Sequence, residues 1–263
     1  MHRSRLSRLF ASKQRSGREV LVVGGLGALV LWAGCAGAGS PIPSVPAHAA
    51  ALVPTSRLDE GWWRQRFERL NELASRGGFD VMFVGDSITQ GWEGAGKQEW
   101  DQKIAPFGAA NFGISGDRTE HVLWRLTHGN LTGALDPKAI VVMLGTNNTG
   151  QRHDRPEEIA AGVAEVTRVL HRRFPRARIL LFAVFPRAAS ASDPDRINND
   201  ATNRLLGHLG GHSGVRVIDI NRRLLSTDGT LMTSVMPDLL HPNATGYAIW
   251  ADALVPEIRA ALN

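Results

Sequence analysis

Short apolar runs alternate with longer stretches of helical periodicity along most of the chain. The apolar runs cover residues 79–84, 109–113, 138–144, 177–184 and 215–220. Runs of this length without an alternating polar face are typical of strands that are buried on both sides. The helical stretches lie near residues 58–76, 97–103, 118–127, 156–174, 196–210 and 244–261. Because strands and helices alternate, the pattern predicts an α/β fold with a parallel sheet that helices cover on both faces.

The first 39 residues differ from the rest in charge and hydropathy. A basic region ends at Arg18, and an apolar, Gly-rich stretch follows from Val20 to about Ala38. This layout is typical of a secretory signal, so we predict an exported bacterial protein that is periplasmic, envelope-attached or secreted. The sole cysteine, Cys35, rules out an intramolecular disulfide and lies in a segment similar to a lipoprotein processing box. Lipid attachment at Cys35, cleavage after Ala38 and an uncleaved membrane anchor all stay open.

The leader also accounts for the basic character of the chain. Residues 1–39 hold six basic residues and one acidic residue, which equals the formal net charge of +5. The balanced remainder argues against a nucleic-acid partner. Residues 40–56 are rich in Pro and small residues and predict a tether, and residues 57–263 show no further boundary or internal repeat. We therefore predict one domain over residues 57–263, whose oligomeric state the sequence leaves open.

Polar, Gly-bearing segments follow the first three apolar runs. They are Gly-Asp-Ser at residues 85–87, Gly-Ile-Ser-Gly-Asp at 113–117 and Gly-Thr-Asn-Asn at 145–148. A fourth polar segment, Asp-Leu-Leu-His-Pro at 238–242, precedes the last helical stretch. Parallel sheets bind their ligands at the carboxyl ends of the strands, so we expect these four segments to meet at one edge.

Ser87 is the candidate nucleophile. It follows Gly85 and Asp86 at the point where a helix would begin. Free N–H groups and the positive end of a helix dipole favour an anion that develops at such a point. Asp-Ser is also an ordinary capping pair at a helix start, so this segment alone does not decide between the two interpretations.

His241 is the candidate base. A serine hydroxyl needs a base to remove its proton, and imidazole is the usual choice because it titrates near neutral pH. Asp238 lies three residues earlier, in a loop that Pro237 and Pro242 restrict. A carboxylate at that spacing can hold the imidazole in one tautomer. The combination predicts a Ser-His-Asp triad.

Three hydrogen-bond donors are candidates for an oxyanion hole. They are the N–H of Ser87, the N–H of Gly116 and the side-chain amide of Asn147, at the ends of three different apolar runs. Losing one such donor typically costs about a hundred- to a thousandfold in rate. The segment 145–148 could also be only a turn.

Other chemistries have weaker support in the sequence. Asp238 and His241 could be a metal-ligand pair, but no second His or carboxylate cluster is evident, so we predict neither a metal nor a cofactor. The adjacent Trp62 and Trp63 could form a substrate platform, although core packing is the more ordinary role of such a pair. Whether Trp92 and Trp124 line a sugar site or pack in the core stays open in the same way.

The four polar segments, in this order, resemble the sequence blocks of the SGNH (GDSL-type) hydrolase superfamily. Residues 111–126, NFGISGDRTEHVLWRL, are similar to the subfamily of platelet-activating-factor acetylhydrolase catalytic subunits. The resemblance implies a flavodoxin-like three-layer α/β/α sandwich with a five-stranded parallel sheet. It also implies Ser87 as nucleophile, His241 as base and Asp238 as its orienting acid, with an oxyanion hole made by Ser87, Gly116 and Asn147.

The same resemblance implies a short acyl pocket walled by Ile88, Thr146 and Leu240. It thus suggests a serine esterase for acetyl-type esters. The leader departs from the cytosolic subfamily, so we expect O-acetylated carbohydrates or other small esters as substrates. A lysophospholipase or thioesterase that prefers long acyl chains, and a non-catalytic glycan-binding module, remain the alternatives.

Overall fold

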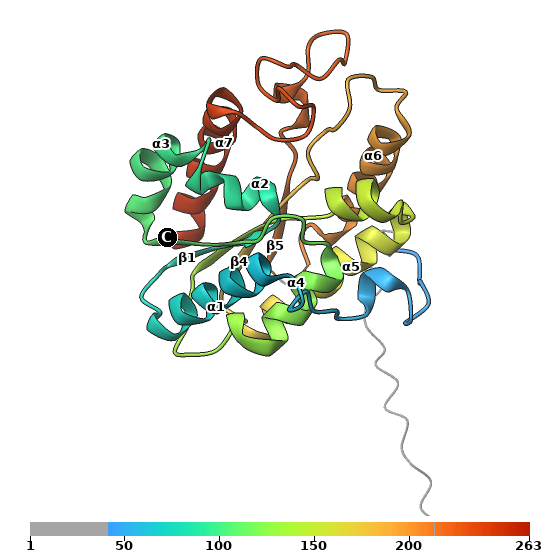
Figure 1. Ribbon diagram of the computed structural model, residues 1–263. Helices are drawn as coiled ribbons and strands as arrows, with labels where there is room; N and C mark the ends of the chain where they lie inside the picture. Colours follow the sequence, from blue (N-terminus) through green and yellow to red (C-terminus); the bar gives the residue numbers. More distant parts are fainter. Residues whose placement is uncertain (1–41, 213) are drawn as a thin grey trace, which may run out of the picture. The chain divides into compact units, whose positions relative to one another are not determined.

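The computed structural model describes residues 42–212 and 214–263 (Figure 1). The predicted leader, including Cys35, lies outside these residues. Within the described ranges, none of the helices combines the length and the apolar character that crossing a membrane requires.

One parallel sheet of five strands forms the centre of the domain, in the order β2-β1-β3-β4-β5. The strands are β1 (Val81–Gly85), β2 (Ala109–Gly113), β3 (Ala139–Met143), β4 (Arg178–Phe182) and β5 (Val215–Ile218). Each of the five predicted runs overlaps one strand, so the predicted fold class is confirmed. The chain passes from β1 to β2 on one side and then crosses to β3 on the other. The loops after β1 and β3 therefore diverge, which is where sheets of this kind bind ligands.

Helices cover the sheet on both faces (Figure 1). The five longest α-helices are α1 (Gly61–Arg76), α5 (Pro156–Arg173), α6 (Pro194–Leu206), α7 (Ala244–Leu262) and α4 (Thr119–Arg125). Shorter helical segments are η1 (Ala50–Leu52), α2 (Ser87–Gln90), η2 (Gly91–Glu93), α3 (Lys97–Glu99), η3 (Trp100–Ile104), η4 (Ala105–Phe107), η5 (Leu126–Asn130), η6 (Asn148–Arg152), η7 (Gly207–Leu209) and η8 (Asn221–Leu224).

Alternate residues of the strands supply two separate cores. Met82 and Val84 of β1 pack with the apolar sides of α1, α4, α5 and α6. Val81 and Phe83 point to the other face and pack with α7 and with the segment that contains Trp92. This two-residue period makes both faces of the central strand apolar, which explains why its sequence is an uninterrupted hydrophobic run.

The segment just before the predicted domain packs against it. Ala49 and Ala51 are buried. The Thr119 hydroxyl donates to the Ala51 carbonyl oxygen at 2.8 Å, and the Thr55 N–H donates to the Glu120 carbonyl oxygen at 3.2 Å. Residues 49–55, which belong to the predicted tether, are therefore held against α4.

The short helix α2 lies directly on the ends of β1 and β2. A Cβ atom placed on Gly113 would lie 2.3 Å from the Gln90 nitrogen and 2.9 Å from the Asp86 carbonyl oxygen. One placed on Gly85 would lie 2.5 Å from the Met143 carbonyl oxygen. Backbone atoms cannot rotate away as a flexible side chain can, so the contact with α2 requires glycine at position 113, and the neighbouring strand β3 requires glycine at position 85.

We expect Gly113→Ala to lower the free energy of unfolding by about 1–3 kcal/mol or more, because the added methyl group overpacks a backbone contact. Urea denaturation would measure the change. Gly207→Ala is the matched control, since a Cβ there has no heavy atom within 4 Å. We expect it to stay within about 0.5 kcal/mol of the parent protein. Equal midpoints for the two variants would contradict this account of the α2 contact.

Candidate active site

The four polar segments predicted from the sequence meet at the carboxyl edge of the sheet. Ser87 and His241 are 154 residues apart in the chain, yet the Ser87 Oγ lies 3.0 Å from the His241 Nε2. The Asn147 amide donates to the Asp117 carbonyl oxygen at 3.0 Å, which joins the segments after β3 and β2. The Ser115 N–H donates to the Gln90 side chain of α2 at 2.8 Å.

Ser87, His241 and Asp238 form one hydrogen-bonded line. The His241 Nδ1 lies 2.6 Å from the Asp238 Oδ2. An ionised carboxylate only accepts hydrogen bonds, so Nδ1 carries the proton and Nε2 is free to accept from the Ser87 hydroxyl. The geometry is that of a nucleophile, a base and an acid that orients the base.

Hydrogen bonds within its own loop orient His241. The Asp238 Oδ1 accepts the backbone N–H groups of His241 at 2.7 Å and of Leu240 at 3.0 Å. Leu239 adopts a left-handed φ of 59° that turns the chain back. Partial burial opposes ionisation of Asp238, but the hydrogen bonds from His241 and Leu240 outweigh it and lower the pKa of the carboxyl. Asp238 is thus held in the charged form that a neighbouring imidazolium needs.

Two buried contacts fix the helix that presents Ser87. Asp86 caps α2 by accepting the Ile88 N–H at 3.0 Å, and the Tyr247 hydroxyl donates to the Ile88 carbonyl oxygen at 2.7 Å. The helix spans only Ser87–Gln90, so its macrodipole is smaller than the sequence argument assumed. Stabilisation of an anion at this point therefore comes from individual backbone N–H groups.

The three predicted oxyanion donors lie on neighbouring loops. In the described residues, the N–H groups of Ser87 and Gly116 donate to no other protein atom. Gly116 has a left-handed φ of 73°, which explains the glycine. The Asn147 Nδ2 uses one hydrogen on Asp117, and its second hydrogen remains for a ligand.

A fully buried ion pair lies behind these loops. The Arg125 Nε donates to the Asp117 Oδ2 at 2.8 Å, and both side chains are inaccessible to solvent. The same guanidinium donates to the Gly85 carbonyl oxygen at 2.9 Å. The other oxygen of Asp117 accepts the Trp63 indole N–H at 2.7 Å and the Arg57 Nη1 at 3.2 Å. Arg125 and Asp117 therefore connect the end of β1 to the loop of Gly116, a role that the sequence argument missed.

Asp86 is a second buried carboxyl at the site. Its Oδ2 is buried and has no hydrogen-bond partner among the described residues. Burial raises the pKa of Asp86 to about 7, and the charge of Asp117 adds to the effect, whereas the Ile88 N–H and His241 oppose it.

The three predicted acyl-pocket residues each adjoin one of these groups. Ile88 is buried in the core below Ser87, and Leu240 is half-buried beside His241. Thr146 is buried next to Asn147, and its carbonyl oxygen accepts the Arg187 Nη1 at 2.8 Å. Ile88 and Leu240 thus supply apolar side chains, and Thr146 a hydroxyl, at positions next in the chain to Ser87, His241 and Asn147.

The four tryptophans that the sequence suggests as candidate substrate contacts differ in how far they are buried. Trp63 and Trp92 are fully buried, and Trp124 is half-buried with its ring stacked on His128 at 4.4 Å. Core packing therefore describes Trp63 but not Trp62, whose side chain is 50% exposed.

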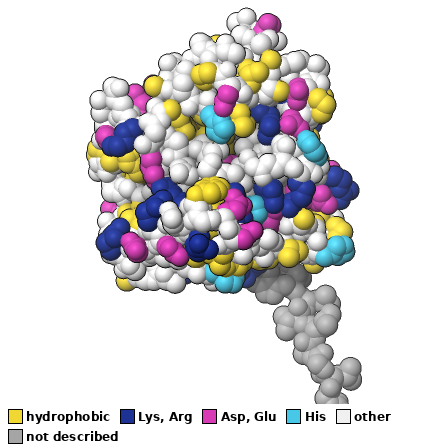
Figure 2. Space-filling view, viewed as in Figure 1, with side chains coloured by type: hydrophobic (Ala, Val, Ile, Leu, Met, Phe, Trp, Pro, Cys, Tyr) yellow, Lys and Arg dark blue, Asp and Glu magenta, His cyan; other side chains and the backbone are white. Residues whose placement is uncertain are grey.

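Two further features bear on the choice of site. In the described residues no group of three or more His, Cys, Asp and Glu side chains is arranged to hold a metal ion. On the face shown in Figure 2, acidic and basic side chains are intermixed rather than separated into patches of one sign.

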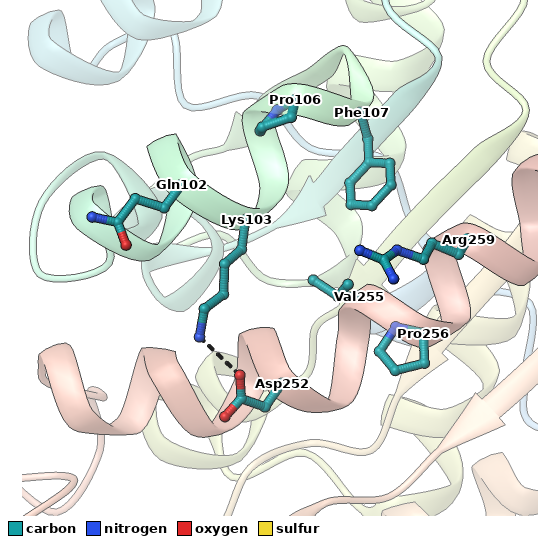
Figure 3. Close-up of a pocket in the computed structure, with 8 residues that line it drawn as sticks. All are labelled: Gln102, Lys103, Pro106, Phe107, Asp252, Val255, Pro256 and Arg259. Atoms are coloured by element: carbon teal, nitrogen blue, oxygen red, sulfur yellow. Dashed lines mark hydrogen bonds and ion pairs between the residues drawn. The ribbon is translucent and has the colours of Figure 1, made fainter.

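A surface cavity of about 460 Å³ lies between the η3–η4 segment and α7 (Figure 3). It is lined by Gln102, Lys103, Pro106, Phe107, Asp252, Val255, Pro256 and Arg259. Phe107 comes just before β2 and so lies at the amino edge of the sheet, whereas Ser87 follows the carboxyl end of β1. This cavity is therefore separate from the hydrogen-bonded line.

Comparison with known proteins gives a consistent result. A family model described as GDSL-like lipase/acylhydrolase matches residues 83–249. The alpha2 subunit of platelet-activating factor acetylhydrolase IB from Rattus norvegicus is 34% identical over 211 residues, which cover 80% of this chain and 87% of that protein.

Two solved structures share the fold. A putative acylhydrolase from Bacteroides fragilis superimposes with a TM-score of 0.63 at 19% identity, covering 76% of this chain and 97% of the other. An acetylxylan esterase from Geobacillus stearothermophilus superimposes with a TM-score of 0.54 at 19% identity, covering 69% and 94%.

The buried carboxyl of Asp86 predicts a pH dependence of stability. The folded protein keeps its proton up to a pKa of about 7, whereas an unfolded chain releases it near pH 4. The contribution of this group to stability is therefore present below about pH 4 and is lost as the pH rises to about 7. Asp86→Asn removes the titration and keeps an oxygen for the Ile88 N–H.

The free energy of unfolding of Asp86→Asn, relative to the parent protein, should accordingly increase between about pH 5 and pH 8. Urea denaturation at a series of pH values would measure it, with the exposed Asp59→Asn as the matched control. A difference for Asp86→Asn that runs parallel to the control would refute the assignment.

Proposed function

The chain belongs to the GDSL-like lipase/acylhydrolase family and is a carboxylic ester hydrolase, and from this premise we propose that it cleaves short-chain, acetyl-type esters with Ser87 as nucleophile. The observation that carries the proposal is the 3.0 Å contact between the Ser87 Oγ and the His241 Nε2. Two side chains so far apart in the sequence meet at hydrogen-bond distance, with the imidazole already oriented by Asp238.

Acylation proceeds in two proton transfers through His241. The Nε2 takes the hydroxyl proton of Ser87 as the Oγ bonds to the ester carbonyl carbon, and Asp238 stabilises the resulting imidazolium. The tetrahedral intermediate then collapses, the bond to the alcohol oxygen breaks, and Nε2 returns the proton to that oxygen. The alcohol leaves, and the acyl group remains on Ser87.

Deacylation repeats the sequence with water. His241 removes a proton from the water molecule that attacks the acyl carbon, and it returns this proton to the Ser87 Oγ as the bond to the acyl carbon breaks and the carboxylic acid leaves, which then ionises in solvent. In both steps the negative charge on the carbonyl oxygen faces the N–H groups of Ser87 and Gly116 and the amide of Asn147. Donors that already point at that position stabilise the transition state without rearranging.

The acyl group is short in this proposal because of what adjoins the nucleophile. Ile88 is fixed in the core, and Leu240 is tied to Asp238 through its backbone N–H. Side chains held in this way cannot easily make room for a long chain. Thr146, held by Arg187, is the proposed third wall.

The residues of the candidate site constrain the alcohol part of the substrate less than they constrain the acyl part. O-acetylated carbohydrates and small esters suit an exported enzyme, and export itself rests on the leader at residues 1–39, which also provides the proposed route to membrane attachment. A lipid alcohol is the second candidate, favoured by the 34% identity to a subunit of platelet-activating factor acetylhydrolase IB. A binding module without chemistry would not need Ser87, His241 and Asp238 in one hydrogen-bonded line.

Ser87→Ala tests the nucleophile directly. We expect kcat/KM for p-nitrophenyl acetate to fall by at least about a thousandfold, because the oxyanion donors alone retain only a small part of the catalysis. Ser75→Ala, a surface serine whose hydroxyl bonds only to the Glu72 carbonyl oxygen, is the matched control. Full activity in purified Ser87→Ala would overturn the proposed mechanism.

A series of p-nitrophenyl esters tests the acyl pocket. We expect kcat/KM for the octanoate to lie at least about tenfold below that for the acetate, since a walled pocket rejects additional methylene groups. Leu240→Ala should narrow this ratio by opening one wall. If the wild-type enzyme prefers the octanoate, the lysophospholipase or thioesterase alternative takes the place of this proposal.

A further inference from the structure

Trp62 is an exposed indole on an otherwise well-packed domain. Only three large hydrophobic side chains are exposed in the described residues, and they are Val53, Trp62 and Ile197. The neighbouring Trp63 is fully buried and hydrogen-bonded to Asp117. Since the fold places one ring of the pair inside and the other outside, packing does not account for a tryptophan at position 62.

Arg57 links this indole to the candidate oxyanion loop. Its Cζ lies 5.0 Å from the centre of the Trp62 ring, over one face. Its Nη1 donates to the Ser115 carbonyl oxygen at 3.0 Å. A Cβ atom on Gly116 would lie 3.6 Å from the same Cζ. The Arg57 guanidinium therefore lies between the Trp62 ring and Gly116, whose N–H is a proposed oxyanion donor.

The guanidinium is held firmly in this place. Glu60 accepts from its Nε and Nη2 at 2.7 and 2.8 Å, and the buried Asp117 accepts from Nη1 at 3.2 Å. A planar cation fixed by four hydrogen bonds can support an aromatic ring from behind. The edge and the other face of Trp62 are then the parts that solvent reaches.

We propose that Trp62, supported by Arg57, forms a platform for a sugar ring in the alcohol part of an acetylated carbohydrate. This inference rests on the proposed esterase activity and names the class of its substrate. An ester with its carbonyl oxygen at Gly116 extends its alcohol part away from Ser87, and the Trp62 ring lies within reach of a group of a few sugar units.

The chemistry around the ring favours a sugar over other alcohols. A sugar ring presents C–H groups to an aromatic face and hydroxyl groups to polar neighbours, and the part-exposed carboxylate of Glu60 lies beside Arg57. A long acyl or alkyl chain would need a continuous apolar surface, whereas Trp62 lies against the Arg57 guanidinium, which is itself paired with Glu60. A quaternary ammonium group prefers an aromatic face, but the cation of Arg57 already covers one side of this ring.

The test compares two substrates that differ only in the alcohol. Release of acetate from acetylated xylo-oligosaccharides and hydrolysis of p-nitrophenyl acetate are measured for the wild type, Trp62→Ala and Trp62→Phe. We expect Trp62→Ala to raise KM for the saccharide about three- to tenfold, the range of one aromatic contact, and to leave kcat/KM for p-nitrophenyl acetate within about twofold. Trp62→Phe should restore part of the saccharide affinity.

Ile197→Ala is the matched control, because Ile197 is 52% exposed and also lies on a helix. We expect it to leave KM unchanged for both substrates. An equal loss on both substrates in Trp62→Ala would mean a structural role and would overturn the platform, and so would no change on either. If Trp62→Ala raises KM more for acetylcholine, or for an acetylated glycerophospholipid, than for the saccharide, then that alcohol and not a sugar is the group that contacts Trp62.

A binding measurement separates the failure of this inference from that of the proposed function. Acetylated xylo-oligosaccharide is titrated calorimetrically into Ser87→Ala and into Ser87→Ala combined with Trp62→Ala. Binding that Trp62→Ala weakens would support the platform even if the wild-type enzyme did not release acetate, and only the proposed activity would fail. Absence of binding to Ser87→Ala would overturn the platform, whatever the esterase assay gives.

Discussion

The buried pair of Arg125 and Asp117 is the interaction on which the geometry of the site depends. Arg125 joins the Asp117 carboxylate to the carbonyl oxygen of Gly85, and the Asp117 backbone accepts the Asn147 amide. Loops from β1, β2 and β3 therefore share one charged centre. Removing one partner of a buried pair typically costs about 3–5 kcal/mol because the other charge is left without compensation. The candidate oxyanion donors are therefore held in place by the same ion pair that connects their loops.

Much of the fold could be predicted because burial on both faces leaves a strong signal. Each strand of the sheet overlaps one apolar run, and α5 begins at Pro156 as its sequence predicts. The structure of the stretch 97–103 is harder to predict, because the chain there forms α3 and then the π-helix η3 rather than one regular helix. Such a change of hydrogen-bond register depends on packing against α7 and leaves no mark in a hydrophobic pattern.

The residues of the candidate site likewise include some that the sequence pattern predicts and others that it does not. Ser87 could be predicted because it lies in a polar segment at a strand end, and Asp238 and His241 because they lie in a polar segment before the last helix, where chemistry is expected. Arg125 could not, because one arginine in a helical stretch ordinarily points to solvent and only the tertiary structure shows it buried beside Asp117. The Trp62–Trp63 pair shows the same limit, since adjacent residues on a helix differ by about 100° in direction and the sequence does not say which one faces inward.

The loop of Asp238 and His241 joins the acid and the base in a unit that is complete without the nucleophile. Three of its hydrogen bonds are internal, and it is tied to distant parts of the chain by the bond from Ser87 and by the Ala188 N–H, which donates to the Leu239 carbonyl oxygen at 3.0 Å. A small shift of this loop would therefore disconnect the serine and leave the imidazole oriented. Restoring the contact with Ser87 would then require no new alignment of the base.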